Sequence, residues 1–226
     1  MSPTQSRSDC SPGYPSPRYR SLVSIGLSLR RIRDYWVRTG HRERLTRELR
    51  PRIARLRGLV LDVGGGRQAL HDDAWQPDVR RIRLDLSPTH RPDIIADAAA
   101  LPFPDGCVDA VVIVEVLEHV SNPASVLEEV QRVLRADGVV VGSVPFVFPI
   151  HGDPSDYYRY TDEGLRHLLS GFARSHVDPI GNRVSAAWII LASGSRTLRI
   201  LNPLLRRLGS RPDSHCPDGY VFTGLK

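Results

Sequence analysis

The sequence lacks a long hydrophobic segment. Its longest uninterrupted apolar run, from Ala186 to Ala192, is far shorter than the roughly 20 residues that a membrane-spanning helix needs. The first residues are rich in Ser, Pro and Arg and contain no apolar core of the kind found in signal peptides. We therefore expect a cytoplasmic protein.

Cysteine and lysine are also scarce. The 3 cysteines are scattered and form no C-x-x-C pair, which argues against a disulfide framework and against a zinc site. Lys226 is the one lysine, so almost all of the 31 basic residues are arginines.

Positive charge is concentrated near the N-terminus. The chain carries a net charge of +6, whereas residues 1–57 hold many arginines and only four acidic residues, and the rest of the chain is slightly acidic. Such a basic segment can contact nucleic acid or an anionic membrane surface. The simpler interpretation is a solvated, arginine-rich helix.

Composition divides the chain into three parts. Residues 1–20 are rich in Ser and Pro and are expected to be disordered. In residues 21–57 apolar side chains recur at helical spacing, which predicts a basic helical extension divided into two helices at Gly40. These helices could cap the domain of residues 58–226 or lie over its substrate pocket.

Short apolar runs alternate with helical patterns in the first half of this domain. The runs have the length and composition of buried strands, and they are residues 59–63, 81–86, 93–95, 108–114 and 138–144. Between the last two runs, Asn122 and Pro123 occupy the N-cap and the first position of a predicted helix.

The second half is less regular. Thr161 can cap a helix, residues 173–181 and 219–226 are predicted as strands, and residues 184–208 are expected to be helical up to a break at Asn202-Pro203. Strands that alternate with helices predict an α/β fold of the doubly wound, Rossmann-like class. We expect a seven-stranded, mostly parallel sheet with helices on both faces.

Three consecutive glycines, Gly64 to Gly66, follow the first predicted strand directly. They therefore lie at the carboxyl edge of the sheet, where open α/β sheets bind their ligands. Because glycine has no Cβ, a ligand can lie against bare backbone whose N–H groups donate to a carboxylate or phosphate. The loop reads D-x-G-G-G and lacks the G-x-G-x-x-G pattern of NAD-binding proteins.

Asp85 lies at the end of the second predicted strand. A carboxylate at this strand tip can accept hydrogen bonds from both vicinal hydroxyls of a ribose. Together with the glycine loop, it predicts an adenosine-containing cofactor. The alternative is that Asp85 is an ordinary surface acid.

Two longer segments carry a family resemblance. They read ADAAALPFPDGCVDAVVIVEVLEHV, from Ala96 to Val120, and VLRADGVVVGSVP, from Val133 to Pro145. Together with the glycine loop and Asp85, they resemble the class I S-adenosylmethionine (SAM)-dependent methyltransferases, in particular the methyltransferase type 11-like group that acts on small molecules and glycans. The resemblance implies SAM as the cofactor.

The resemblance also implies a role for each matching position. Asp62, Gly64 and Gly66 would form the loop under the methionine part of SAM. Asp85 would hold the ribose hydroxyls, and Leu86 would pack on the adenine.

The next matching segment would complete the cofactor site. Asp97 and Ala98 would bracket the adenine, and Glu115 would lie at the sulfonium end of SAM. Glu118 and His119 would begin the next helix near the cofactor, or they would only cap and pack that helix.

One position departs from the family pattern. Gln68 stands where the glycine loop of the family usually continues with another glycine. The linker to the second strand is short and contains Pro77, so we expect the helix after the loop to be brief or distorted.

A loop dense in titratable and aromatic side chains follows the fifth strand, on the side where the acceptor should lie. His151 is predicted as a general base and Tyr158 as a second catalytic residue. Alternatively, the aromatic rings pack this loop onto the sheet and Asp156 pairs with Arg159. Methyl transfer from a sulfonium requires no metal, and no metal ligand is predicted. Similar loops in the family look associated with polysaccharide or natural-product pathways, which suggests a hydroxyl acceptor.

Three functions are compatible with these features. The first is SAM-dependent methyl transfer, at oxygen, to a small-molecule, glycan or lipid-linked acceptor. The second is a SAM-binding domain without catalysis that serves as a partner module. The third, a nucleic-acid methyltransferase, is disfavoured because the chain lacks an N/D-P-P-Y/F tetrad and a Pro-Cys nucleophile. A basic amphipathic helix in residues 184–208 could also contact an anionic membrane, which would suit a lipid-linked acceptor.

Overall fold

The computed structural model describes residues 40–66, 71–152, 155–193 and 212–226. Several predictions on the remaining residues therefore lie outside the described part of the chain. They are the disordered tail 1–20, the helix predicted before Gly40, the position of Gln68 and most of the helix 184–208.

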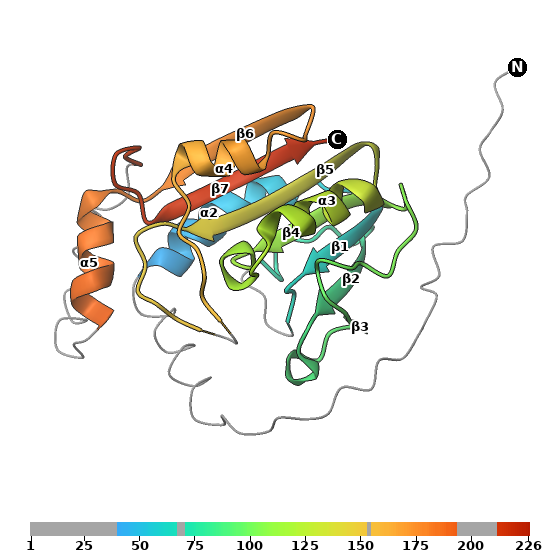
Figure 1. Cartoon of the computed structure of the whole chain (residues 1–226), viewed down its shortest axis with the longest axis horizontal. Coiled ribbons are helices and arrows are strands. Elements are labelled where there is room, and N and C mark those ends of the chain that lie inside the picture. The colour runs from blue at the N-terminus through green and yellow to red at the C-terminus, as the bar shows by residue number, and fades with distance from the viewer. Residues whose placement is uncertain (1–39, 67–70, 153–154, 194–211) are drawn as a thin grey trace, which may run out of the picture.

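A seven-stranded sheet forms the centre of the protein (Figure 1). The strand order is β3-β2-β1-β4-β5-β7-β6, and β7 runs antiparallel to both of its neighbours while the other pairs are parallel. The strands are β1 (Leu59–Val63), β2 (Arg80–Asp85), β3 (Ile94–Ile95), β4 (Val108–Val114), β5 (Leu134–Pro145), β6 (Arg174–Ile180) and β7 (Gly219–Leu225). This arrangement confirms the predicted doubly wound, mostly parallel α/β fold.

One face of the sheet is covered by α3 (Pro123–Val133) and α4 (Asp162–Leu168), which lie on the near side in Figure 1. The predicted caps are confirmed: the side chain of Asn122 accepts from the backbone N–H of Ser125, and Thr161 accepts from that of Gly164. The buried stripe of α3 packs on this face through Val126, Leu127, Val130 and Val133.

The opposite face is covered by α2 (His41–Ile53). Gly40 lies just before this helix with a φ of 77°, a left-handed conformation that favours glycine. Each face of the sheet has its own hydrophobic core. Leu45, Leu49 and Ile53 are fully buried in the core on this face, where they pack with residues of β1, β4 and β5. The segment predicted as an extension thus supplies a helix that covers the sheet.

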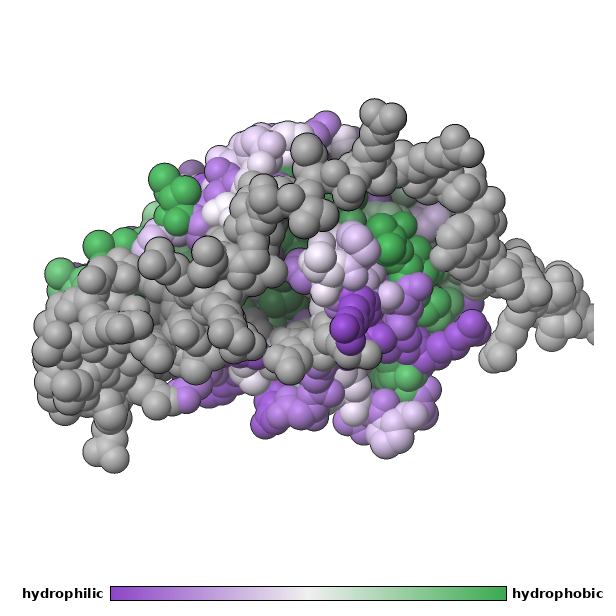
Figure 2. Space-filling model, turned by 90° about the horizontal axis from the view of Figure 1, so that it is seen from below, coloured by the Kyte–Doolittle hydropathy of each residue, from purple (hydrophilic) through white to green (hydrophobic). Residues whose placement is uncertain are grey.

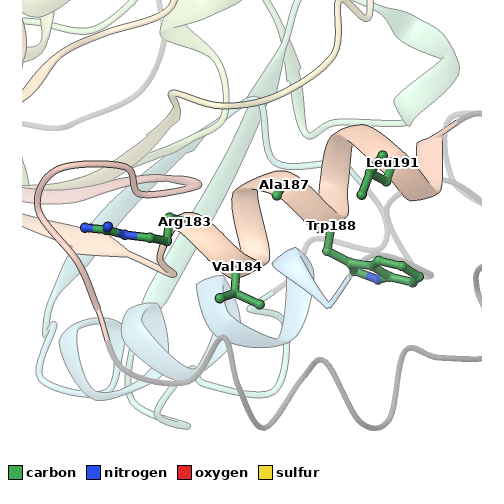
Figure 3. Close-up of a pocket in the computed structure, with 5 residues that line it drawn as sticks. All are labelled: Arg183, Val184, Ala187, Trp188 and Leu191. Carbon is green, nitrogen blue, oxygen red and sulfur yellow. The ribbon is translucent and has the colours of Figure 1, made fainter.

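A fourth helix, α5 (Arg183–Ser193), follows β6. Its residues Arg183, Val184, Ala187, Trp188 and Leu191 line a shallow pocket of about 440 Å³ (Figure 3). Seen from below, the surface mixes hydrophilic and hydrophobic residues, and hydrophilic groups gather along its lower border (Figure 2). None of the helices in the described ranges is long and apolar enough to cross a membrane.

Two local details differ from the predictions. The described part of the linker between β1 and β2, from residue 71 on, forms turns and contains no helix. Glu118 and His119 do not begin α3; they lie in a separate 3-10 helix, η2 (Leu117–His119), because Pro123 fixes the start of α3 further along.

Candidate functional site

The glycine loop leaves β1 at the carboxyl edge of the sheet. Gly64 has a φ of 73°, and its N–H donates to the carbonyl of Leu84 at 2.7 Å. A Cβ at Gly64 would overlap the side chain of Val116, whereas one at Gly66 would meet only ordinary contacts, the nearest 3.5 Å away on His90. The chain itself therefore requires a glycine at position 64 but not at 66, where bare backbone suits a ligand.

Asp62 supports this loop from beneath. Its side chain is 1% exposed, accepts from Nε of Arg81 at 2.9 Å, and lies 3.3 Å from Nε2 of His71. A Cβ at Gly65 would overlap the same carboxylate. The structure thus places Asp62 under the loop, while its contact with SAM stays a prediction.

Asp85 lies beside the glycine loop at the tip of β2. Its carboxylate accepts from the N–H of Ser87 at 2.7 Å and lies 2.9 Å from Nδ1 of His90. His90 also lies beside Gly66, so the two predicted cofactor elements are neighbours. Leu86, which follows Asp85 in the chain, is 53% exposed, as expected of a side chain that packs on the ring of a ligand.

The two residues predicted to bracket the adenine follow β3. Asp97 is exposed and accepts from the N–H of Ala99 at 2.9 Å, and Ala98 is buried. A hydrogen bond from the N–H of Ala96 to the carbonyl of Asp85, at 3.2 Å, ties this segment to the tip of β2. Both segments that were predicted to bind the adenosine therefore lie on one edge of the sheet.

Glu115 connects the ends of β4 and β5. Its N–H donates to the carbonyl of Ser143 at 3.1 Å, and its carboxylate accepts from the hydroxyl of Ser143 at 2.7 Å. Its φ of 54° is unusual for a residue with a Cβ, and such conformations cluster at functional sites.

A buried charged cluster, which the sequence patterns did not predict, lies behind Glu115. His41, at the start of α2, lies 3.7 Å from the carboxylate of Glu115 and 3.7 Å from that of Asp218. Asp218 also accepts from Nε of Arg44 at 2.8 Å and from the hydroxyl of Ser185 at 2.6 Å. No sequence signal joins His41 to Asp218, because they lie at opposite ends of the chain and meet only through the fold.

The two carboxylates keep His41 charged. Burial alone would lower the pKa of His41, but its interactions with Asp218 and Glu115 outweigh burial and raise the pKa to about 9. Burial alone would raise the pKa of Asp218, and the pairing with His41 and Arg44 lowers it instead. The imidazolium therefore balances two acids at the inner wall of the site.

We expect this ion pairing to make the stability of the fold depend on pH. A pKa of about 9 in the folded state, against 6.5 for an unperturbed histidine, stabilises the protein fully below about pH 6.5, and this contribution is lost as pH rises through about 9. Its size is about 3 kcal/mol. Urea unfolding at about pH 6 and about pH 10 should show this decrease, and His41→Gln should remove most of the difference. An equally steep decrease in His41→Gln would contradict the assignment.

The polar loop after β5 is fastened to the segment after β4. The N–H of Tyr157 donates to the carbonyl of Glu118, and the hydroxyls of Tyr158 and Tyr160 donate to the carbonyls of Ser121 and Leu117, each at 2.8 Å. The structure thus brings together the loop that was predicted beside the acceptor and the segment that was predicted near the cofactor. The hydroxyl of Tyr158 is engaged with the backbone, and its catalytic role stays a prediction.

Asp156 and Arg159 form the local pair that was considered as an alternative for this loop. Nη2 of Arg159 lies 2.7 Å from Asp156, which also accepts from the N–H of His151 at 2.7 Å. Burial would raise the pKa of Asp156, but the hydrogen bond from Arg159 outweighs it and lowers the pKa to about 2. This fixed carboxylate holds the backbone of His151 in place.

His151 lies inside the loop, with its ring 5.0 Å from those of Phe148 and His119. Its Nδ1 is 3.2 Å from the carbonyl of Pro149. Since a carbonyl only accepts, Nδ1 carries the proton and Nε2 carries the lone pair. Burial, and then the neighbouring His119, lower the pKa of His151.

Glu118 is a fully buried acid of the site. No described group donates to either of its carboxylate oxygens. Burial, and then the charge of Glu115, raise the pKa of Glu118 well above its usual value. Capping of a helix does not explain this residue, because its carboxylate caps nothing.

Comparison with known proteins agrees with this geometry. The methyltransferase domain family matches residues 61–142, which run from β1 into β5 and include the glycine loop, Asp85, Asp97 and Glu115.

Two relatives are described as uncharacterized methyltransferases. One, from Mycolicibacterium gilvum, is 33% identical over 126 residues, which cover 50% of this chain and 46% of that protein. The other, from Mycobacterium tuberculosis, is 28% identical over 204 residues, which cover 82% of this chain and 72% of that protein. The chain therefore spans less than half the length of the first relative.

Solved structures share the fold. A SAM-dependent methyltransferase from Archaeoglobus fulgidus superimposes with a TM-score of 0.57 at 18% identity, over 86% of this chain and 99% of that one. A [4+2]-cyclase superimposes with a TM-score of 0.53 at 21% identity, over 81% of each chain. Residues 61–142 therefore match a methyltransferase domain, and the chain has the fold of SAM-dependent methyltransferases.

Proposed function

We propose that this protein transfers the methyl group of SAM to a hydroxyl oxygen of a small-molecule, glycan or lipid-linked acceptor. One observation supports this most directly. The glycine loop and Asp85 at one end, and the loop of His151 at the other, adjoin the same carboxyl edge of the sheet, with Glu115 between them. A donor and an acceptor bound along this edge would meet near Glu115.

The residues along this edge fit the cofactor. Bare backbone at Gly66 suits the methionine part, and Asp85 offers a carboxylate to the ribose hydroxyls. Leu86, Asp97 and Ala98 would enclose the adenine. SAM, when bound, supplies an electrophilic methyl group on a sulfonium.

On the acceptor side, we propose that His151 activates the hydroxyl. Its proton is held on Nδ1 by the carbonyl of Pro149, so the lone pair that would accept the hydroxyl proton is on Nε2. Tyr157, Tyr158 and Tyr160 hold the loop on the segment after β4 and thereby fix the position of His151. Alignment of the two reactants is the main requirement of an in-line displacement.

A second candidate is a SAM-binding domain without methyl transfer. We keep this candidate because a [4+2]-cyclase shares the fold, so the fold alone does not determine the reaction. Contact with nucleic acid or with a membrane surface rests on the basic N-terminal segment and on residues 184–208, most of which the structure does not describe.

A methyl-transfer screen separates these candidates. The protein is incubated with methyl-labelled SAM and with pools of glycans, lipid-linked glycans and small hydroxyl compounds, and the products are identified by mass spectrometry. We expect label in an O-methyl ether. SAM binding without any labelled product would favour the domain without catalysis.

A further inference from the structure

Three side chains of the kinds that bind metals converge beside the acceptor loop. Glu118, His119 and His151 each offer one ligand atom, and these atoms all lie within 4.8 Å of one another. Two of them come from η2 after β4, and His151 comes from the loop after β5. Methyl transfer from a sulfonium does not need such a cluster, so it calls for an explanation of its own.

Both imidazoles are oriented as metal ligands usually are. Nδ1 of His119 lies 2.5 Å from the carbonyl of Ser155, and Nδ1 of His151 lies 3.2 Å from that of Pro149. Each carbonyl fixes a proton on Nδ1 and leaves the lone pair on Nε2. Backbone carbonyls commonly orient metal-binding histidines in this way.

Glu118 completes the set. Its oxygen lies 3.6 Å from Nε2 of His119, its side chain is fully buried, and neither oxygen has a hydrogen-bond partner among the described residues. A buried carboxylate without a donor is costly, and a cation between Glu118 and the two imidazoles would satisfy it.

We propose that Glu118, His119 and His151 bind a divalent first-row transition-metal ion, of which zinc is the representative, and that this ion binds the acceptor. Two imidazoles and one carboxylate suit such ions, and three protein ligands leave positions open for a substrate oxygen. The ion is a cofactor that the sequence did not predict.

The role of the ion in the reaction rests on the proposed function. A cation at this place would lower the pKa of an acceptor hydroxyl, and His151 would then promote the reaction as a ligand of the ion instead of accepting the proton itself. The hydroxyl proton leaves to solvent, and an oxygen lone pair forms the new O–C bond. The electron pair of the broken S–C bond stays on sulfur, and the demethylated cofactor departs as a neutral thioether.

Metal binding is tested on the full chain, without an affinity tag and after dialysis against a chelator. The protein is titrated with Co²⁺, followed by visible absorption, and with Zn²⁺, followed by calorimetry. We expect one ion per chain and displacement of Co²⁺ by Zn²⁺. Glu118→Gln and His119→Ala should each weaken Zn²⁺ binding by roughly 100-fold, whereas His176→Ala, on an exposed histidine of β6, should not change it.

The outcomes separate this proposal from the proposed function. Absence of binding to the wild-type chain, or equal binding in all variants, overturns the metal site even if the chain binds SAM. Thermal unfolding of the metal-free proteins shows whether Glu118→Gln and His119→Ala are folded. If one of these two variants does not fold, the Zn²⁺ affinity of the other variant tests the metal site. Metal binding by a wild-type chain that does not bind SAM would refute the proposed function and leave the metal site intact.

Discussion

His151→Ala is expected to lower kcat by about 100-fold to 10,000-fold while leaving the Kd for SAM within about twofold of wild type. The imidazole lies on the acceptor side, in the loop after β5, and no SAM-binding role is proposed for it. Its loss removes the group that activates the hydroxyl. Turnover is measured with the acceptor found by methyl-label transfer, and SAM affinity by calorimetry.

His176→Ala is the matched control for this variant. His176 is 70% exposed on β6 and pairs with Asp178, so its removal should leave both kcat and SAM affinity unchanged. If His151→Ala loses SAM affinity and turnover to the same degree, the loop of His151 is structural and its catalytic assignment is wrong.

Asp85→Ala is expected to weaken SAM binding by about 10-fold to 100-fold, because hydrogen bonds to a charged group are worth about 1.5–3 kcal/mol. The carboxylate lies at the tip of β2 beside the glycine loop and now contacts His90 and Ser87. In the complex with SAM, the ribose hydroxyls would donate hydrogen bonds to this carboxylate and replace part of its present contacts. Calorimetric titration with SAM measures the change in Kd.

His90→Ala separates a direct contact from a structural one. It removes the internal partner of Asp85 and keeps the carboxylate, so SAM affinity should change much less than in Asp85→Ala. If both variants lose the same affinity, Asp85 acts by holding the local structure instead of binding the ribose. Wild-type affinity in Asp85→Ala would exclude the ribose assignment altogether.

Local sequence signals predicted most of the fold. The apolar runs became β1, β4 and β5 because strands covered on both faces are mostly apolar, whereas β2 and β3 are only partly buried. The capping residues Asn122 and Thr161 fixed the starts of α3 and α4. The packing of α2 on the sheet was harder to predict, because the sequence pattern of an amphipathic helix is the same whether the helix covers a domain or lies outside it.

The candidate site could be predicted only where its residues follow strands directly. Gly64, Asp85 and Glu115 could be predicted to lie near one another because the carboxyl ends of parallel strands meet at one edge. The pairing of His41 with Asp218 could not be predicted from the sequence, since this contact depends on how α2 and the segment before β7 meet in space. The convergence of Glu118 with His151 likewise depends on the packing of two loops.

The central claim is that this chain binds SAM along the carboxyl edge of its sheet. Calorimetric titration of the full chain with SAM and with its demethylated product tests this claim most directly. We expect saturable heat with one molecule bound per chain, and a thermal unfolding midpoint that rises with ligand concentration. Absence of both heat and thermal stabilisation at millimolar concentrations would contradict the account.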